Sequence, residues 1–393
     1  MHDGSAAPMV DSMHAHWDAP HAYWARLRAE APVALARPTS PDEMPVYYIS
    51  RWADVDTVLR DAETFSSSIN AQGTGQFMGP VMLSMDGEQH RAHRFLVSRA
   101  FRASQLAKWE AGLIRPAIEG LCDSVAGHGK AELVGDVISR FPVLVICALC
   151  GIPAQDSPRF LQWAMDIHRG MHNPEVGMAA AQAMQAYLEP IVEARRLSPG
   201  DDLISDIVQA EVDGQKLSDE EIYGFLRLLL PAGSESTFRT MASALLALLT
   251  TPGLLDRAIA DRSVLPLVVE ETIRWDVANT MVSRVTTRDT VLAGVAIPAG
   301  SALLIMTASA NRDGDHFAHP GIFDPDRPAI RHLGFGAGPH QCLGLNLARI
   351  ELRIGLDAIL DRLPNLRLDS DFPVPEIGGF GFRGPTALHV RFD

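Results

Sequence analysis

The chain has 393 residues, a formal net charge of −14 and a hydrophobic content of 47%. This content can supply a substantial core, whereas the acidic balance argues against a general nucleic-acid or anionic-membrane binder. The first residues lack a signal-peptide pattern, and no run of about 18 apolar residues predicts a membrane span. We therefore expect a cytoplasmic protein that binds neither nucleic acid nor membrane.

Cysteine use also narrows the class of protein. The four cysteines are too few for a disulfide framework. Cys147 and Cys150 match C-x-x-C, which can indicate a redox or zinc site. Their apolar neighbours, and the lack of a second ligand pair in the sequence, favour packing in a buried helix instead.

The N-terminal half mixes elements at first and then becomes helical. Residues 70–80 are rich in glycine and polar residues, so we expect a loop that carries exposed Phe77 and Met78. The other predictions are a helix at 21–30, a strand at 46–50, a helix at 52–60 and mostly helix at 104–209, broken at 151–153 and 199–200.

A basic segment follows the predicted loop. His90 and Arg94 stand four residues apart and would share one face of a helix. A guanidinium and an imidazole suit a carboxylate by geometry and charge, although a solvated basic face is the plainer alternative. Further cations continue this basic patch, namely Arg91, Arg99, Arg102 and Lys108.

A long helix is predicted from the capping box at 218–221 to about residue 250. Pro231 and Gly233 weaken its middle, next to Ala232. A carboxylate and a hydroxyl, Glu235 and Ser236, follow directly, with Thr237 after them. By itself this pattern indicates a kinked core helix.

A glycine-rich loop stands near the end of the chain, at 335–344. Its glycines permit sharp turns and a close approach to a flat partner. Cys342 lies where an amphipathic helix begins, and unpaired N–H groups there favour an anionic sulfur suited to ligating a metal. The alternative is a buried structural cysteine.

This loop resembles the haem-binding loop of the cytochrome P-450 family, F-G-x-G-x-H-x-C-x-G. All six fixed positions are met, by Phe335, Gly336, Gly338, His340, Cys342 and Gly344. The resemblance implies a mainly α fold with small β-sheets (α+β), a triangular helix-rich prism holding haem b between the long central helix and the Cys-loop helix. It implies a single domain over residues 1–393, with a β-rich lobe from about residues 31–61, 283–305 and 370–393.

The resemblance also implies roles for individual residues. Cys342 would be the proximal ligand to the haem iron, and the propionates would be bound by His90, Arg94, Arg284 and His340. Ala232 and Gly233 would lie over the distal haem face, where Glu235 and Ser236 would manage protons and water. The family usually has Thr at the position of Ser236, so Thr237 remains a possible substitute. A structural charge network would join Glu271, Arg274 and Arg327.

By resemblance, the protein is a monooxygenase that activates O2 and hydroxylates, or epoxidises, a hydrophobic small molecule. The candidate pocket residues are Phe77, Met78, Met281, Val282 and Phe380. The family's soluble bacterial members receive electrons from NAD(P)H through ferredoxin reductase and a ferredoxin, for which the basic patch is a candidate docking site. We expect a monomer. The alternatives are a peroxide-driven enzyme and a non-enzymatic haem sensor, and the Glu235–Ser236 pair argues against both.

Overall fold

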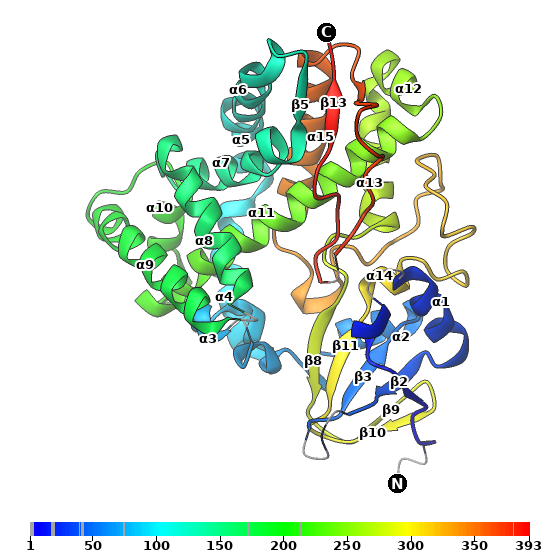
Figure 1. The fold of residues 1–393 in the computed structure, drawn as a ribbon. Coiled ribbons are helices and arrows are strands. Elements are labelled where there is room, and N and C mark those ends of the chain that lie inside the picture. The colour runs from blue at the N-terminus through cyan, green and yellow to red at the C-terminus, as the bar shows by residue number, and fades with distance from the viewer. Residues whose placement is uncertain are drawn as a thin grey trace.

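Helices make up most of the structure, a computed structural model that describes residues 4–16, 20–38, 40, 43–73, 75–170, 173–212, 214–379 and 381–393. The expected mainly α fold with small β-sheets is confirmed. Figure 1 shows the helices above and to the left of a sheet-rich lobe, with the long helix α11 crossing the middle of the molecule. The helices are α1 Pro20–Glu30, α2 Trp52–Arg60, α3 Gly75–Met78, α4 Gly87–Ser98, α5 Ala103–Trp109, α6 Arg115–Ala126, α7 Arg140–Leu149, α8 Ser157–Arg169, α9 Pro174–Leu197, α10 Leu203–Val208, α11 Asp219–Thr250, α12 Leu254–Ala260, α13 Leu265–Trp275, α14 Thr307–Ala310 and α15 Leu345–Arg362.

The largest sheet joins strands from distant parts of the chain, in the order β1-β2-β3-β11-β8-β4. β3 pairs in parallel with β11, and β11 pairs in antiparallel fashion with β8, so Leu303 lies opposite Arg284. The strands are β1 Met9–Val10, β2 Val33–Ala36, β3 Val46–Ile49, β4 Phe65–Ser66, β5 Lys130–Glu132, β6 Glu211–Val212, β7 Gln215–Lys216, β8 Val282–Thr286, β9 Thr290–Leu292, β10 Val295–Ile297, β11 Ala302–Ile305, β12 Arg367–Leu368 and β13 His389–Arg391.

The C-terminal segment does not join this sheet, so the expectation that residues 370–393 contribute to the β-rich lobe is wrong. β13 pairs with β12 and β5 in a separate three-stranded sheet. Figure 1 shows β13 and β5 at the opposite end of the molecule from β2, β3 and β11. Asn279 and Phe382 form an isolated bridge, which brings the segment near the start of β8 without adding a strand to the lobe.

The predicted loop at 70–80 is wrong in part, because it contains the short helix α3. Phe77 and Met78 are buried rather than exposed, at 5% and 2% relative exposure. The Phe77 ring lies against Gly170 and Gly177, where an added Cβ would come within 3.1 Å of the ring. Tertiary packing under α8 and α9 therefore overrides the polar composition of the segment.

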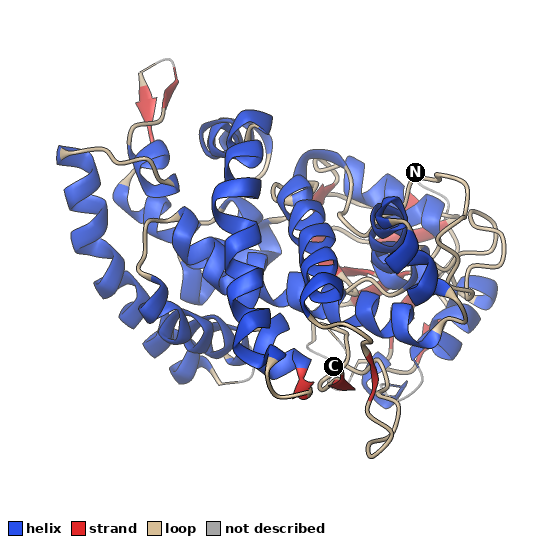
Figure 2. Ribbon diagram, turned by 90° about the horizontal axis from the view of Figure 1, so that it is seen from above, coloured by secondary structure: helices blue, strands red, loops and turns tan. Residues whose placement is uncertain are grey.

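The central helix α11 begins as predicted. The Ser218 side chain accepts a hydrogen bond from the Glu221 N–H, and the Glu221 carboxylate accepts one from the Ser218 N–H. The helix ends before Thr251 and continues without interruption through Pro231. Much of α11 is buried, because α7, α8, α13 and α15 pack around it. Figure 2 shows from above how helices dominate the molecule.

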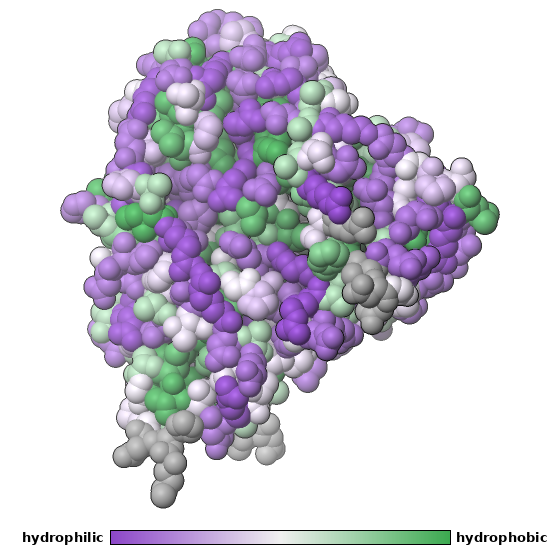
Figure 3. Space-filling model, turned by 180° about the vertical axis from the view of Figure 1, so that it is seen from behind, coloured by the Kyte–Doolittle hydropathy of each residue, from purple (hydrophilic) through white to green (hydrophobic). Residues whose placement is uncertain are grey.

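The core divides into one large helical cluster and two smaller clusters beside the main sheet. Cys122, Cys147 and Cys150 are buried free thiols, which confirms that the C-x-x-C pair belongs to the core. The face in Figure 3 is mainly hydrophilic, with small scattered hydrophobic patches. Within the described residues no single helix has the length and apolarity to cross a bilayer, and only the bent pair α11–α12 passes that test jointly.

Candidate functional site

The loop before α15 is shaped by two glycines with left-handed backbone. Gly336 and Gly338 have φ of 68° and 69°. At Gly338 an added Cβ would lie 2.3 Å from the Leu59 carbonyl oxygen, so only glycine lets the loop lie against α2. The Cys342 N–H donates to the Phe335 carbonyl at 2.9 Å, which closes the loop and sets the direction of the cysteine.

Cys342 is the one accessible cysteine of the four. Burial by surrounding protein atoms raises the pKa of its thiol, and the Gly344 N–H, Arg94 and Arg349 only partly offset this effect. Accessibility and dense surroundings occur together when a side chain lies on the wall of an internal space. The helix-start effect expected from the sequence is thus weaker than burial, and coordination to a metal ion would be needed to hold the thiolate.

Two histidines and two arginines gather beside this loop. The rings of His90 and His340 lie 4.0 Å apart between centroids, and His340 Nε2 lies 3.3 Å from Asp86 Oδ1. Arg94 donates to the Gln341 carbonyl at 2.6 Å, and buried Arg284 donates to the carbonyl of Ser283 at 2.7 Å. The chain therefore brings together the four residues predicted to bind carboxylates, from α4, β8 and the loop.

This cluster is short of negative charge. Burial, then Arg284 and His90, lower the pKa of His340 to about 4, and burial lowers the pKa of Arg284 to about 10. His90 Nε2 is buried without a hydrogen-bond partner. Such a set is suited to two carboxylates that would satisfy these donors. Together with an accessible thiol, and open space where a Cβ of Gly344 would stand, it fits a haem with its two propionates.

The middle of α11 also carries accessible residues. Ala232 is exposed although helices surround α11, and Ser236 is half-buried one turn later. The Ser236 hydroxyl donates to the Ala232 carbonyl at 3.0 Å. Thr237 is buried at 5% relative exposure. An added Cβ at Gly233 would lie 2.5 Å from the end of the Ile146 side chain, which would have to move to make room.

Glu235 is not a free carboxylate. Its Oε1 accepts hydrogen bonds from Arg239 Nε at 2.9 Å and Nη2 at 2.7 Å. Its Oε2 lies 2.5 Å from Nδ1 of His168 on α8. Burial raises the pKa of Glu235, but His168 and then Arg239 outweigh it, so the pKa is lowered and the carboxylate is ionised at neutral pH.

Sequence reasoning missed both partners of Glu235. Arg239 stands four residues after Glu235, a spacing that could have indicated the pair. His168 carries no such signal, because a tertiary contact between α8 and α11 brings it to Glu235. Asp86, which contacts His340 and accepts from Ser66 at 2.6 Å, was also missed.

The predicted pocket residues lie in two different parts of the fold. Buried Phe77 and Met78 lie in α3, which packs against α11 and α9. Met281 and Val282 are half-buried at the start of β8. Phe380 lies outside the described residues.

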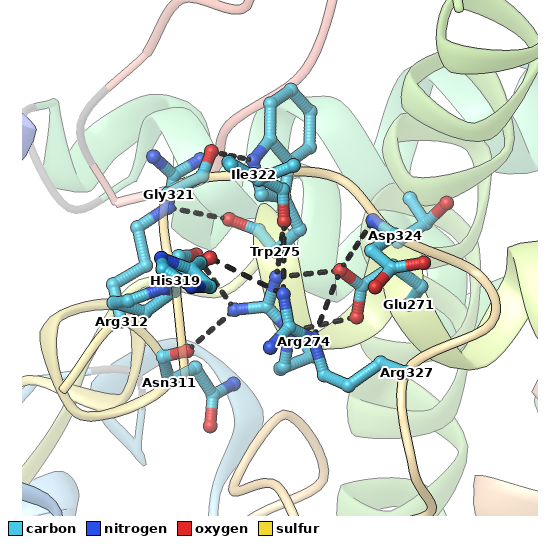
Figure 4. Close-up of polar contacts among 12 residues, drawn as sticks. Glu271, Arg274, Trp275, Asn311, Arg312, His319, Gly321, Ile322, Asp324 and Arg327 are labelled. Carbon is cyan, nitrogen blue, oxygen red and sulfur yellow. Dashed lines mark hydrogen bonds and ion pairs between the residues drawn. The ribbon is translucent and has the colours of Figure 1, made fainter. Parts of the chain in front are cut away.

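The predicted charge network is assembled around Glu271 and Arg274, as Figure 4 shows. Arg274 donates to Glu271 through Nε at 2.7 Å and Nη2 at 2.6 Å, and Arg327 Nε lies 3.4 Å from Glu271. The Asp324 N–H adds a hydrogen bond to Glu271 at 2.9 Å. Both Glu271 and Arg274 are buried, at 5% and 2% relative exposure.

Comparison with known proteins gives the same family throughout. The cytochrome P450 family model matches residues 152–374. Pulcherriminic acid synthase of Bacillus subtilis is 32% identical over 95% of both chains. Mycinamicin IV hydroxylase/epoxidase of Micromonospora griseorubida is 34% identical over 93% of this chain and 94% of that one.

The chain belongs to the cytochrome P450 family. The solved structure of the P450 CYP109Q5 from Chondromyces apiculatus superposes with a TM-score of 0.87, at 32% identity over 98% of both chains. The P450 CYP109E1 from Bacillus megaterium, solved with testosterone, gives 0.85 at 30% identity, over 95% of this chain and 99% of that one. This P450 is therefore a haem b monooxygenase, an oxidoreductase.

Proposed function

We propose that this P450 inserts one atom of O2 into a hydrophobic small molecule, using electrons that pass from NAD(P)H through a ferredoxin reductase and a ferredoxin. The observation that carries the proposal is the accessible Cys342 beside a cluster of four cationic or imidazole side chains that faces a single carboxylate, that of Asp86. The chain would act as a single haem domain and as a monomer.

In this proposal Cys342 is the proximal ligand to the haem iron, and the loop around Gly336, Gly338 and Gly344 accepts the flat cofactor. His90, Arg94, Arg284 and His340 hold the propionates. When bound, the thiolate-ligated haem supplies the activation of O2. Glu271, Arg274 and Arg327 join α13 to the segment 311–327 and are proposed to stabilise the fold without touching the reactants.

Ser236 is the proposed alcohol of the distal site, because its side chain shares the accessible face of α11 with Ala232. Thr237 is buried on another face, which makes it the weaker candidate. The Ser236 hydroxyl can donate and accept hydrogen bonds and so can order water near bound O2. Glu235 supplies the charge that keeps protons available in this region.

The substrate pocket is proposed to be apolar. Phe77, Met78, Met281, Val282 and Phe380 are its candidate lining, and burial of apolar surface would hold a hydrophobic substrate near the haem. The P450 solved with testosterone supports inclusion of steroids in a substrate screen. Hydroxylation is the primary expected reaction, and the hydroxylase/epoxidase relative supports a test for epoxides as well.

The ferredoxin is proposed to dock on the basic patch, which begins on α4. Arg91 and Arg102 are exposed and, within the described residues, make no ion pair. Phe95 between them in sequence is 55% exposed, which offers an apolar contact inside a basic rim. Lys108 is paired with Asp201 and contributes less charge than the sequence suggested. The Arg99 side chain lies outside the described part.

One set of measurements tests the proposed function. The dithionite-reduced protein under carbon monoxide should show the strongly red-shifted Soret band of thiolate-ligated haem. Testosterone and other apolar compounds should then be screened for a spin-state shift, and hits tested for product with NADH, reductase and ferredoxin. A normal folded protein without haem, or with the carbonyl spectrum of histidine-ligated haem, would refute the proposal. Product formed only with added hydrogen peroxide would indicate the peroxide-driven alternative.

The docking site is tested by charge reversal. Arg91→Glu and Arg102→Glu should each raise the KM for ferredoxin roughly threefold to tenfold at low salt, because rim charges act mainly on association. The rate at saturating ferredoxin should not change. Arg26→Glu, an exposed change on α1, is the matched control. Equal effects in all three variants would contradict docking at this patch.

A further inference from the structure

The Glu235 carboxylate is held between two helices by two nitrogen-bearing side chains. Arg239 binds Oε1 with two hydrogen bonds, and His168 approaches Oε2 to 2.5 Å. His168 comes from the last turn of α8, and Arg239 comes from α11 itself. Glu235 and His168 are largely but not completely covered, with side-chain exposures of 16% and 23%.

The surroundings hold both partners of Glu235 in place. An added Cβ at Gly384 would lie 2.9 Å from the Cβ of Arg239, so the C-terminal segment presses directly on that side chain. The His168 ring lies 5.0 Å from the ring of Phe382, in the same segment. Three parts of the chain, α8, α11 and residues 382–384, therefore fix the orientation of the carboxylate.

In this arrangement the side chains of Glu235 and Ser236 contact different groups. The Ser236 hydroxyl donates to the Ala232 carbonyl, whereas Glu235 Oε1 accepts from Arg239 and Oε2 is in close contact with Nδ1 of His168. An imidazole has two ring nitrogens, and it can accept a proton on one of them and release a proton from the other.

We propose that His168 is a positioning and proton-relay residue for this P450: it orients Glu235 and resupplies it with protons, while Arg239 holds the other oxygen. This inference rests on the proposed role of Glu235 in the distal site. In the neutral ring with its proton on Nδ1, Nε2 takes a proton from solvent and Nδ1–H gives its proton to Glu235 Oε2. One proton enters and one leaves, so the ring ends neutral with its proton on Nε2, and exchange with water returns the proton to Nδ1.

The demand for these protons follows from the balance of the reaction. Hydroxylation consumes one O2, two electrons and two protons for each substrate molecule, and releases one water. If protons arrive at the wrong time or place, the same electrons and protons convert O2 into hydrogen peroxide and the substrate is unchanged. A defect in His168 should therefore shift NADH-derived electrons from product to hydrogen peroxide.

The first test is a double-mutant cycle with His168→Asn and Glu235→Gln. Asn places an amide N–H near the position of Nδ1 but cannot relay a proton. The free energies of unfolding of the holoprotein in guanidinium chloride should be clearly non-additive, since the two side chains interact directly. Additive effects would show that the pair does not form, and would overturn the proposal.

The second test measures electron coupling, with a matched control. His168→Asn should lower the fraction of NADH electrons recovered as product by roughly threefold to tenfold, since positioned proton donors contribute at least about a hundredfold. The substrate-induced spin-state shift should keep its Kd. His93→Asn removes a comparable pair between α4 and α11, in which His93 Nδ1 lies 3.5 Å from Glu221, and should leave coupling unchanged.

The outcomes separate this inference from the proposed function. Full coupling in His168→Asn, or an equal loss in His93→Asn, would overturn the relay. A loss of coupling in His168→Asn but not in His93→Asn, together with non-additive unfolding free energies in the double-mutant cycle, would support the relay. If the unmodified enzyme forms no product with any donor, the proposed function fails, and the double-mutant cycle then decides by itself whether His168 holds Glu235.

Discussion

Replacing Arg274 with methionine should destabilise the protein severely. Arg274 is buried and makes two hydrogen bonds to Glu271, at 2.6 and 2.7 Å. It also donates to the carbonyls of Asn311 and Pro320 at 2.9 Å and of Ile322 at 3.2 Å (Figure 4). Methionine fills part of the volume but satisfies none of these acceptors.

The size of the effect follows from the burial of the charges. Removal of one partner from a buried ion pair costs about 3–5 kcal/mol, because the other charge remains in a low-dielectric site. Arg327 Nε, at 3.4 Å from Glu271, and the Asp324 N–H offset part of this loss. We therefore expect about 4 kcal/mol, which is a large part of the roughly 5–15 kcal/mol that stabilises a typical protein.

The assay is urea denaturation of the holoprotein followed by far-UV circular dichroism. Arg353→Met is the matched control, because Arg353 and its partner Glu110 are 34% and 38% exposed. Such an exposed pair contributes about 0–1 kcal/mol. The double variant Glu271→Gln/Arg274→Met should lose less stability than the sum of the single variants. If Arg274→Met and Arg353→Met differed by less than about 1 kcal/mol, the reasoning from buried charge would be refuted.

Three further predictions concern the site and its surroundings. Ser236→Ala should divert electrons from product to hydrogen peroxide, with a loss of coupling of about tenfold; unchanged coupling of NADH use to product would contradict the assignment. Cys342→His should move the Soret band of the reduced carbonyl complex to shorter wavelength, and an unmoved band would exclude Cys342 as the ligand. Burial raises the pKa of Glu270, but His332 and Arg349 outweigh it and lower the pKa to about 2. Because this folded-state pKa is depressed, the stabilisation is present above the unfolded pKa of about 4.3 and is lost as pH falls toward 2. The difference in unfolding free energy between the parent and Glu270→Gln should shrink over that range, and a constant difference would contradict the depressed pKa.

Local signals accounted for the elements that the sequence predicted well. The capping box of Ser218 and Glu221 depends on residues three apart, so it could be recognised without tertiary information. The need for glycine in the Cys342 loop could also be recognised from the sequence. The left-handed backbone and the tight approach to Leu59 both require glycine there. These features place the central helix and the loop that frame the site.

Features that depend on distant partners were missed. Phe77 is buried because Gly170 and Gly177, about a hundred residues later, leave room for its ring. The final strand, β13, pairs with β5 and β12, and its few residues carry no local signal for these partners. The contact of His168 with Glu235 likewise exists only once α8 lies across α11.

The order of strands in the main sheet has a consequence for synthesis of the chain. β3 finishes at Ile49, and its parallel neighbour β11 finishes at Ile305, opposite it in register. At about 5–20 residues per second, a ribosome would need roughly 13 to 50 s to make the intervening chain. During that time β3 has an unpaired edge, and β8, which carries Arg284, is made only shortly before its partner β11. The cofactor cluster is therefore expected to form late, and a chaperone that shields the N-terminal strands on the ribosome should raise the yield of folded protein.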